Sequence, residues 1–243
     1  MFDELTTAEL VVVAGLAGLA AARLCVHAAF SAGSQIFGRT LIATRNPNEI
    51  ALTFDDGPND PYTGQLLDVL AQHQVKATFF MIGDNVRQRP DIVRAVQSAG
   101  HLIGNHTMTH PWLTFQSPAK VRQELGDCNA VLEDVLGQPV SYFRPPYGAR
   151  RPDVLRAARE LGLEPVMWNI MCGDWKPTST AAGIQTSIEE GLARNRHAGR
   201  SSNVLLHDGG QAGISRDRSA TVSAVRTAVP KLLESQYRFT TFI

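Results

Sequence analysis

The chain has 243 residues, 44% of them hydrophobic, and its 23 Lys and Arg residues balance its 23 Asp and Glu residues. This length suits one large domain or two small ones, and the zero net charge argues against a nucleic-acid partner bound by bulk electrostatics. The three cysteines, Cys25, Cys128 and Cys172, lie far apart and form neither a disulfide framework nor a CxxC metal site, so they are interpreted as free thiols.

Residues 1–30 are predicted to form a hydrophobic N-terminal helix. Residues 10–22 carry no polar side chain, whereas Arg23 and His27 interrupt the stretch that follows. Because a spanning helix needs about 20 apolar residues, two alternatives stay open. One is a membrane anchor through residues 10–30, and the other is a helix packed on the domain or on a membrane surface. The first ten residues are acidic, which predicts no cleavable signal peptide.

Residues 31–48 are interpreted as a linker, and from Glu49 short apolar strands alternate with helices. Strands are predicted over 50–54, 77–82, 101–105, 140–143, 164–170, 203–207 and 238–242. Helices are predicted from Pro61, from Pro90, over 118–136, over 152–162, over 181–193 and over 223–235. Asp60 is expected to cap the first of these helices. The alternation predicts an α/β domain over residues 49–243, a distorted (β/α) barrel of about seven parallel strands.

Polar clusters follow five of the predicted strands. They read "DD" at 55–56, "NHTMTH" at 105–110, "RPPYG" at 144–148, "CGDW" at 172–175 and "HDGG" at 207–210. The carboxyl ends of the strands in a parallel barrel share one face, where barrel enzymes build their active sites. We therefore expect the five clusters to converge on one site.

Two adjacent carboxylates, Asp55 and Asp56, repel each other unless a cation lies nearby. His106 and His110 are four residues apart, so one helical turn would point both imidazoles the same way. Two histidines and one carboxylate form a catalytic metal pattern when one position stays open for water. We expect one Asp to bind the metal and the other to act as a base on the metal-bound water. The alternative, a helix cap at residues 57–58, would not explain two carboxylates.

The remaining clusters offer catalytic partners. Arg144 is interpreted either as a tether for the free carboxylate or as a structural arginine, and the amide of Tyr147 is a candidate oxyanion contact. Asp174 is expected to orient His207 and favour its protonated form, making it a general acid. Asp208 should point away from the site, because it follows His207 directly in an extended strand end. Trp175 reads equally well as a sugar platform or as core.

Taken in order, "TFDDGP", "HTMTH", "RPPYG", "GDW" and "LLHDGG" resemble the five motifs of the polysaccharide deacetylase family. This is the NodB-homology group, carbohydrate esterase family 4, and the likeness runs from Glu49 to about Ile243. The resemblance implies a distorted (β/α) barrel with a divalent metal, zinc first and Co²⁺, Mn²⁺ or Ni²⁺ as alternatives. The resemblance implies that Asp55 is the base, oriented by Arg144, and that the metal ligands are Asp56, His106 and His110. It implies that the Tyr147 amide contacts the oxyanion and that Asp174 tunes His207, the general acid. It also implies that Trp175 and Leu206 form the wall of the acetyl pocket.

One position departs from the family pattern. The fourth motif is often Asp-x-x-Asp-Trp, and here Met171 takes the place of the first Asp. The second Asp is kept as Asp174, so the predicted pairing with His207 survives, whereas a polar contact at the groove edge is lost.

The expected activity is metal-dependent removal of N-acetyl groups from N-acetylglucosamine-type glycans, peptidoglycan- or chitin-like, in the cell envelope. A second interpretation is a deacylase or deformylase of a lipid-linked sugar at the membrane, because residues 10–30 are apolar. A third is an inactive sugar-binding module, which would lack the base or a metal ligand. All of these residues are present.

Overall fold

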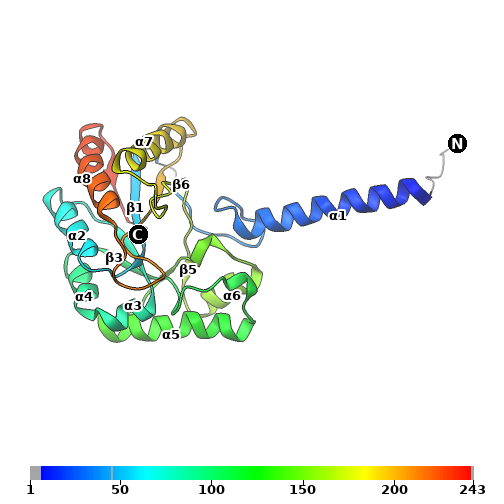
Figure 1. The fold of residues 1–243 in the computed structure, drawn as a ribbon, viewed down its shortest axis with the longest axis horizontal. Coiled ribbons are helices and arrows are strands. Elements are labelled where there is room, and N and C mark those ends of the chain that lie inside the picture. Colours follow the sequence, from blue (N-terminus) through cyan, green and yellow to red (C-terminus); the bar gives the residue numbers. More distant parts are fainter. Residues whose placement is uncertain (1–6, 45, 242–243) are drawn as a thin grey trace.

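A parallel sheet forms the centre of the domain in the computed structural model, which describes residues 7–44 and 46–241 (Figure 1). The strands are β1 (Glu49–Gly57), β2 (Thr78–Met81), β3 (Leu102–Asn105), β4 (Tyr142–Phe143), β5 (Glu164–Pro165), β6 (Ile170–Met171), β7 (Ser202–His207) and β8 (Arg238–Phe239). Their order is β5-β4-β3-β2-β1-β7-β6, and β8 pairs with β1. The sheet curls into a half-barrel, which confirms the predicted distorted (β/α) barrel.

The single strand predicted over 164–170 is two short strands. β5 pairs with β4 at one end of the sheet, and β6 pairs with β7 at the other. The intervening residues therefore cross between the two ends, and Val166 forms a parallel bridge with Leu41 on the way. A strand that changes partners within seven residues cannot remain continuous.

Residues 31–48, expected to be a linker, contact this crossing. The Leu41 amide donates to the carbonyl of Pro165 at 2.8 Å, and the Ser201 amide donates to the carbonyl of Thr44 at 3.2 Å. The segment therefore contacts β5 at one end of the sheet and the residue that precedes β7 near the other end. The segment has mixed polarity, so the sequence showed no strand pattern here. Its pairing with the crossing residues is brief, through the amide and the carbonyl of Leu41.

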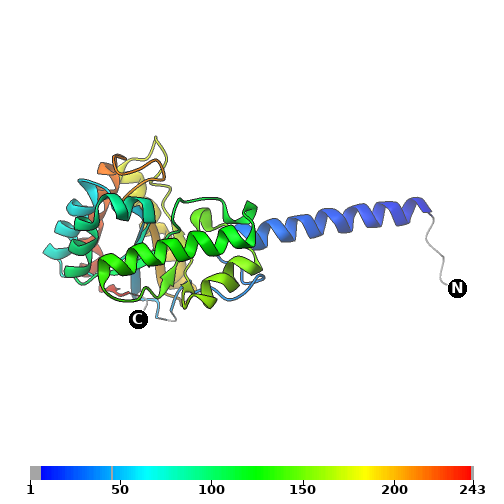
Figure 2. The ribbon, with the colours of Figure 1, turned by 90° about the horizontal axis from the view of Figure 1, so that it is seen from below.

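Helices pack around the sheet (Figure 2). They are α2 (Tyr62–Gln72), α3 (Gly83–Gln88), α4 (Pro90–Ser98), α5 (Pro118–Leu136), α6 (Pro152–Glu160), α7 (Ala181–His197) and α8 (Ser219–Glu234). Ser117 caps α5 by accepting from the Lys120 amide at 3.2 Å, and Gly137 ends it at φ +67°. The short helix α3 was not predicted.

Asp60 does not cap α2, contrary to expectation. Pro61 occupies the N-cap position without a side-chain hydrogen bond. The Asp60 carboxylate instead accepts from the Arg89 guanidinium at 2.6 Å. An ion pair with Arg89 thus replaces the cap that the sequence suggested.

The N-terminal helix α1 (Thr7–Phe30) confirms the predicted hydrophobic helix over the residues that are described. It points away from the domain, and only its C-terminal end meets the domain (Figures 1 and 2). Leu16, Leu19, Leu24 and Val26 are exposed, whereas Ala28 is buried. Within residues 7–44 and 46–241, no helix combines the length and apolar character needed to cross a membrane.

Candidate active site

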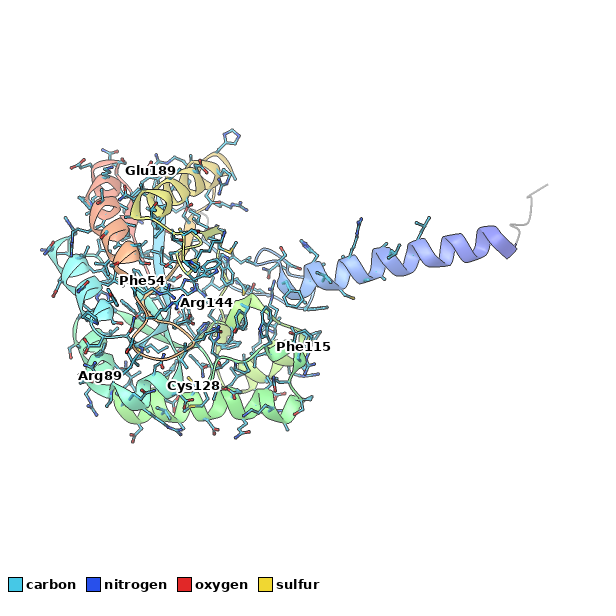
Figure 3. All side chains as sticks on the ribbon, viewed as in Figure 1. Phe54, Arg89, Phe115, Cys128, Arg144 and Glu189 are labelled. Atoms are coloured by element: carbon cyan, nitrogen blue, oxygen red, sulfur yellow. The ribbon has the colours of Figure 1, made fainter. Side chains whose placement is uncertain are left out.

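The five polar clusters converge on one cavity of about 440 Å³ at the carboxyl ends of the strands. Its lining includes Asp55, Asp56, His106, His110, Tyr147, Trp175 and His207. Figure 3 shows Arg144 in the middle of the domain. Arg144 and Asp174 are buried directly behind the residues that line the cavity.

Three side chains form a candidate metal centre in this cavity. Asp56 Oδ1 lies 3.3 Å from His106 Nε2 and 3.1 Å from His110 Nε2. The Nδ1–H of His106 donates to the carbonyl of Arg144 at 2.8 Å, which leaves the Nε2 lone pair directed at Asp56. Asp56 Oδ1 is buried and has no hydrogen-bond donor among the described residues. Two imidazole lone pairs and one orphaned carboxylate oxygen suit a divalent cation.

The charges around Asp56 agree with this interpretation. Burial opposes ionisation of its carboxyl, but His106, His110 and the nearby His207 outweigh burial and hold the pKa of Asp56 well below its usual range. The carboxylate is therefore ionised at neutral pH and ready to bind a cation.

The turn between His106 and His110 is not helical, contrary to expectation. Thr107 and His110 have φ values of 68° and 59°, in the left-handed region. Side chains hold this turn: Asn105 Oδ1 accepts from the Thr107 amide at 2.8 Å, and Thr107 Oγ1 accepts from the His110 amide at 3.0 Å. These local bonds replace helical ones, and the imidazoles still converge.

Asp55 has a different cationic partner from Asp56. Arg144 Nη1 lies 2.8 Å from Asp55 Oδ1 and also donates to Thr53 Oγ1 at 2.7 Å. The guanidinium carbon lies 4.2 Å from the Phe80 ring centroid. Burial lowers the pKa of Arg144, and the charge of Asp55 opposes that shift. His106 Nε2 also lies 3.8 Å from Asp55 Oδ2, so the two carboxylates share this imidazole. They are tolerated side by side because Arg144 pairs with Asp55, while His106 and His110 lie nearest to Asp56.

His207 and Asp174 form a third pair across the cavity. The Nδ1–H of His207 donates to Asp174 Oδ1 at 2.8 Å, and Thr221 Oγ1 donates to Asp174 Oδ2 at 2.9 Å. Burial disfavours the imidazolium, but Asp174, with smaller contributions from Asp56 and Asp55, raises the pKa of His207 to about 9. The His207 imidazole is therefore protonated at neutral pH, and its ring centroid lies 5.2 Å from that of Trp175.

Tyr147 lies at the cavity mouth in a left-handed conformation, with φ 59°. Its ring packs edge-on against His110 at 4.7 Å, and its hydroxyl donates to Gln211 Oε1. The two prolines before it restrict the backbone of this turn. The turn therefore has a defined orientation beside the candidate metal centre.

Leu206 does not wall the cavity, so that assignment was wrong. It lies in the hydrophobic core, and Leu205 lines the cavity instead. Side chains alternate along β7, so the residue two positions before His207 shares its face of the sheet. That residue is Leu205. The same alternation turns Asp208 away from the cavity, as expected, where its Oδ2 accepts from Thr63 Oγ1 at 2.5 Å.

Sequence reasoning missed several residues that line the cavity. They are Trp168, Leu205, Gln211, Ala212, Arg216 and Arg218. Met171, which takes the place of the first Asp of the fourth motif, also lines the cavity. Strand alternation could have found Leu205. The residues after position 210 belong to a long segment without a periodic pattern, so no sequence signal placed them.

Comparisons with known proteins agree with this arrangement. The family model described as polysaccharide deacetylase matches residues 43–166. A chitooligosaccharide deacetylase from Rhizobium leguminosarum bv. trifolii is 39% identical over 196 residues, which cover 78% of this chain and 88% of the relative.

Two solved structures share the fold. The Bc1960 peptidoglycan N-acetylglucosamine deacetylase has a TM-score of 0.74 at 32% identity, covering 84% of this chain and 90% of the other. A family 4 acetyl xylan esterase from Clostridium thermocellum, solved in complex with a cobalt ion, has a TM-score of 0.69 at 29% identity, covering 79% and 87%. The sequence match over most of the chain, together with the shared fold, shows that this chain is a member of the polysaccharide deacetylase family, carbohydrate esterase family 4.

Proposed function

We propose that the protein removes N-acetyl groups from N-acetylglucosamine-type glycans, peptidoglycan- or chitin-like, in a metal-dependent hydrolysis. The observation that carries this proposal is that the neighbouring carboxylates Asp55 and Asp56 have different principal partners. Asp56 faces two imidazoles in a cation-binding arrangement, whereas Asp55 faces Arg144 and remains available as a base. The relatives named above as glycan deacetylases support the substrate class.

A divalent cation fits the site formed by Asp56, His106 and His110, and when bound it would supply Lewis-acid polarisation and an activated water. The nitrogen and oxygen donors favour zinc, with cobalt, manganese or nickel as alternatives. The remaining chemistry belongs to the chain itself.

Asp55 acts as the general base in this proposal. It removes a proton from the attacking water, whose oxygen bonds to the acyl carbon of the substrate amide. Arg144 keeps the Asp55 carboxylate oriented toward the cavity through the 2.8 Å contact. The Tyr147 amide donates to the developing oxyanion.

His207 acts as the general acid on the opposite wall. Its raised pKa keeps it protonated at neutral pH, so it can transfer a proton to the departing nitrogen as the carbon–nitrogen bond breaks. Asp174 holds the ring so that Nε2 is the atom that donates. Acetate and a free amino sugar are the products.

The test is mass spectrometry of acetylated chito-oligomers after incubation with the zinc-supplemented protein. Loss of acetyl mass with the wild type, and none with Asp55→Asn, is the expected result. Unchanged oligomers under metal-loaded conditions would overturn the proposed substrate class. Full activity of Asp55→Asn would overturn the assignment of the base.

A further inference from the structure

Three aromatic side chains form an exposed strip beside the cavity, here called the aromatic ridge: Tyr147, Trp112 and Phe115. Their relative exposures are 38%, 42% and 77%. Trp112 and Phe115 lie outside the cavity lining, whereas Tyr147 belongs to both. Large apolar side chains that gather on a surface mark a binding site more often than scattered ones do.

The rings are arranged in a continuous series that starts at the candidate metal centre. The Tyr147 ring contacts His110 edge-on at 4.7 Å, and Trp112 stacks on Tyr147 at 3.9 Å with an interplanar angle of 7°. Two further rings meet Trp112: Phe30, at the end of α1, packs edge-on at 6.0 Å, and Phe115 lies 6.4 Å away. Figure 3 shows Phe115 at the edge of the domain, on the side from which α1 leaves it. The ridge therefore leads outward from the site of reaction.

The backbone beneath the ridge is held in place. Trp112 directly precedes the short helix η1 (Leu113–Phe115), whose Leu113 is fully buried. The Arg151 guanidinium donates to the carbonyl of Thr114 at 3.0 Å and to that of Gln116. A surface that is already ordered loses little conformational entropy when it binds a ligand.

We propose that the aromatic ridge binds the sugar residues next to the one that reacts, with Trp112 as the main platform. This inference rests on the proposed function and specifies its substrate as an oligomer rather than a single sugar. The C–H groups on the face of a pyranose ring carry partial positive charge, and the face of an indole ring is negative. Residues 112–116 carry no charged side chain, which suits a neutral glycan.

The test is the dependence of kcat/KM on chain length, measured from the dimer to the pentamer of N-acetylglucosamine. Wild type should gain about tenfold in kcat/KM over this series, an increment in the range of one good aromatic contact. Trp112→Ala should lose most of this gain, chiefly through KM. Trp112→Phe should keep much of it, and Trp112→Leu, which keeps apolar volume without a π face, should not.

Several outcomes would overturn the inference. If kcat/KM of Trp112→Ala depended on oligomer length as it does in wild type, Trp112 would not be a sugar platform. If Trp112→Leu kept the full wild-type gain, Trp112 would act only as an apolar contact and its π face would have no role. Leu233→Ala is the matched control, because Leu233 is an exposed apolar side chain on α8 outside the cavity and the ridge. It should behave like wild type.

A binding measurement separates this inference from the proposed function. If wild type releases no acetate from any oligomer, the proposed function fails, and the ridge is then tested by calorimetric titration with the pentamer. Weaker binding by Trp112→Ala, by about tenfold relative to wild type and Leu233→Ala, would support the ridge. Equal affinities, or no binding by wild type, would overturn it.

Discussion

Arg144 and Asp55 form a buried ion pair, with 2.8 Å between Nη1 and Oδ1, in which neither side chain has more than a trace of solvent exposure. The pair joins β1 to the turn that follows β4. Because Asp56 is the next residue, any loss of the guanidinium would leave two neighbouring carboxylates with one fewer cation. The contact therefore serves both stability and the proposed base.

Arg144→Met should be strongly destabilising and nearly inactive. Removing one partner of a buried pair leaves an uncompensated charge, which costs about 3–5 kcal/mol. We expect the free energy of unfolding from urea titration to fall by that amount and kcat/KM to fall at least about 100-fold. Arg89→Met is the control, because Arg89 pairs with Asp60 and Asp91 at the surface. A variant at position 144 no less stable than this control would contradict the prediction.

Zinc should stabilise the protein through Asp56, His106 and His110. A ligand that binds only the folded state stabilises it by about 2.7 kcal/mol at 100 times its Kd. Zinc should therefore raise the Tm of wild type, and His106→Ala or His110→Ala should each abolish most of the rise. His197→Ala, an exposed histidine at the end of α7, is the control. An undiminished zinc response in both ligand variants would place the metal elsewhere.

Activity should decline on the alkaline side as His207 loses its proton. The pKa of His207 is raised to about 9, so the general acid is present at neutral pH and is lost as the pH rises through that value. A divalent cation at Asp56 adds positive charge nearby and moves this limb below 9. Asp174→Asn removes the partner that raises the pKa, so its alkaline limb should lie at still lower pH. The kcat/KM profiles of the two proteins, measured with the same metal, test this.

The same shift predicts how stability depends on pH. A histidine whose folded pKa exceeds its unfolded value of 6.5 stabilises the fold fully below that value. This contribution should disappear as the pH rises from about 6.5 to about 9. His207→Gln should lack this component when urea titrations are compared at the two ends of the range. An unchanged pH dependence in that variant would show that His207 is not protonated in the fold.

The sequence predicted the convergence of the site better than its local geometry. Polar residues that interrupt apolar strands at their carboxyl ends could be placed on one face, because parallel strands share a direction. The turn from His106 to His110 could not be predicted, since Asn105 and Thr107 hold it through side-chain bonds. The break within residues 164–170 depends on a change of strand partner, which no local pattern records.

The positions of Leu205 and Leu206 give a direct test of strand register. Leu206 lies in the core, so Leu206→Ala should lower the free energy of unfolding by about 2–5 kcal/mol. Its KM should stay close to that of wild type. Leu205→Ala should instead change KM, because Leu205 lines the cavity. Urea titration and steady-state kinetics on both variants measure this, and the reverse pattern would mean that β7 is out of register by one residue.

Arg150 connects the N-terminal segment to the turn that carries Tyr147. Its guanidinium donates to the carbonyls of Gly148, Ser31 and Ser34 at 2.9, 2.6 and 2.8 Å. Burial lowers the pKa of Arg150 to about 10, which still leaves it charged at neutral pH. One buried side chain thus satisfies three carbonyl groups from two segments far apart in the sequence.

Arg150→Met should therefore weaken both stability and catalysis. Leaving buried carbonyls without a donor costs about 1–3 kcal/mol each where water does not replace it, so we expect a loss of at least about 2 kcal/mol in urea titration. The Tyr147 turn, which is left-handed and loses its support, should relax. Because a misplaced contact costs up to about 100-fold in rate, we expect kcat to fall by about 10- to 100-fold. Arg226→Met, at an exposed position on α8, is the control. If Arg150→Met matched that control in both measurements, residues 31–34 would contribute nothing to the active-site turn.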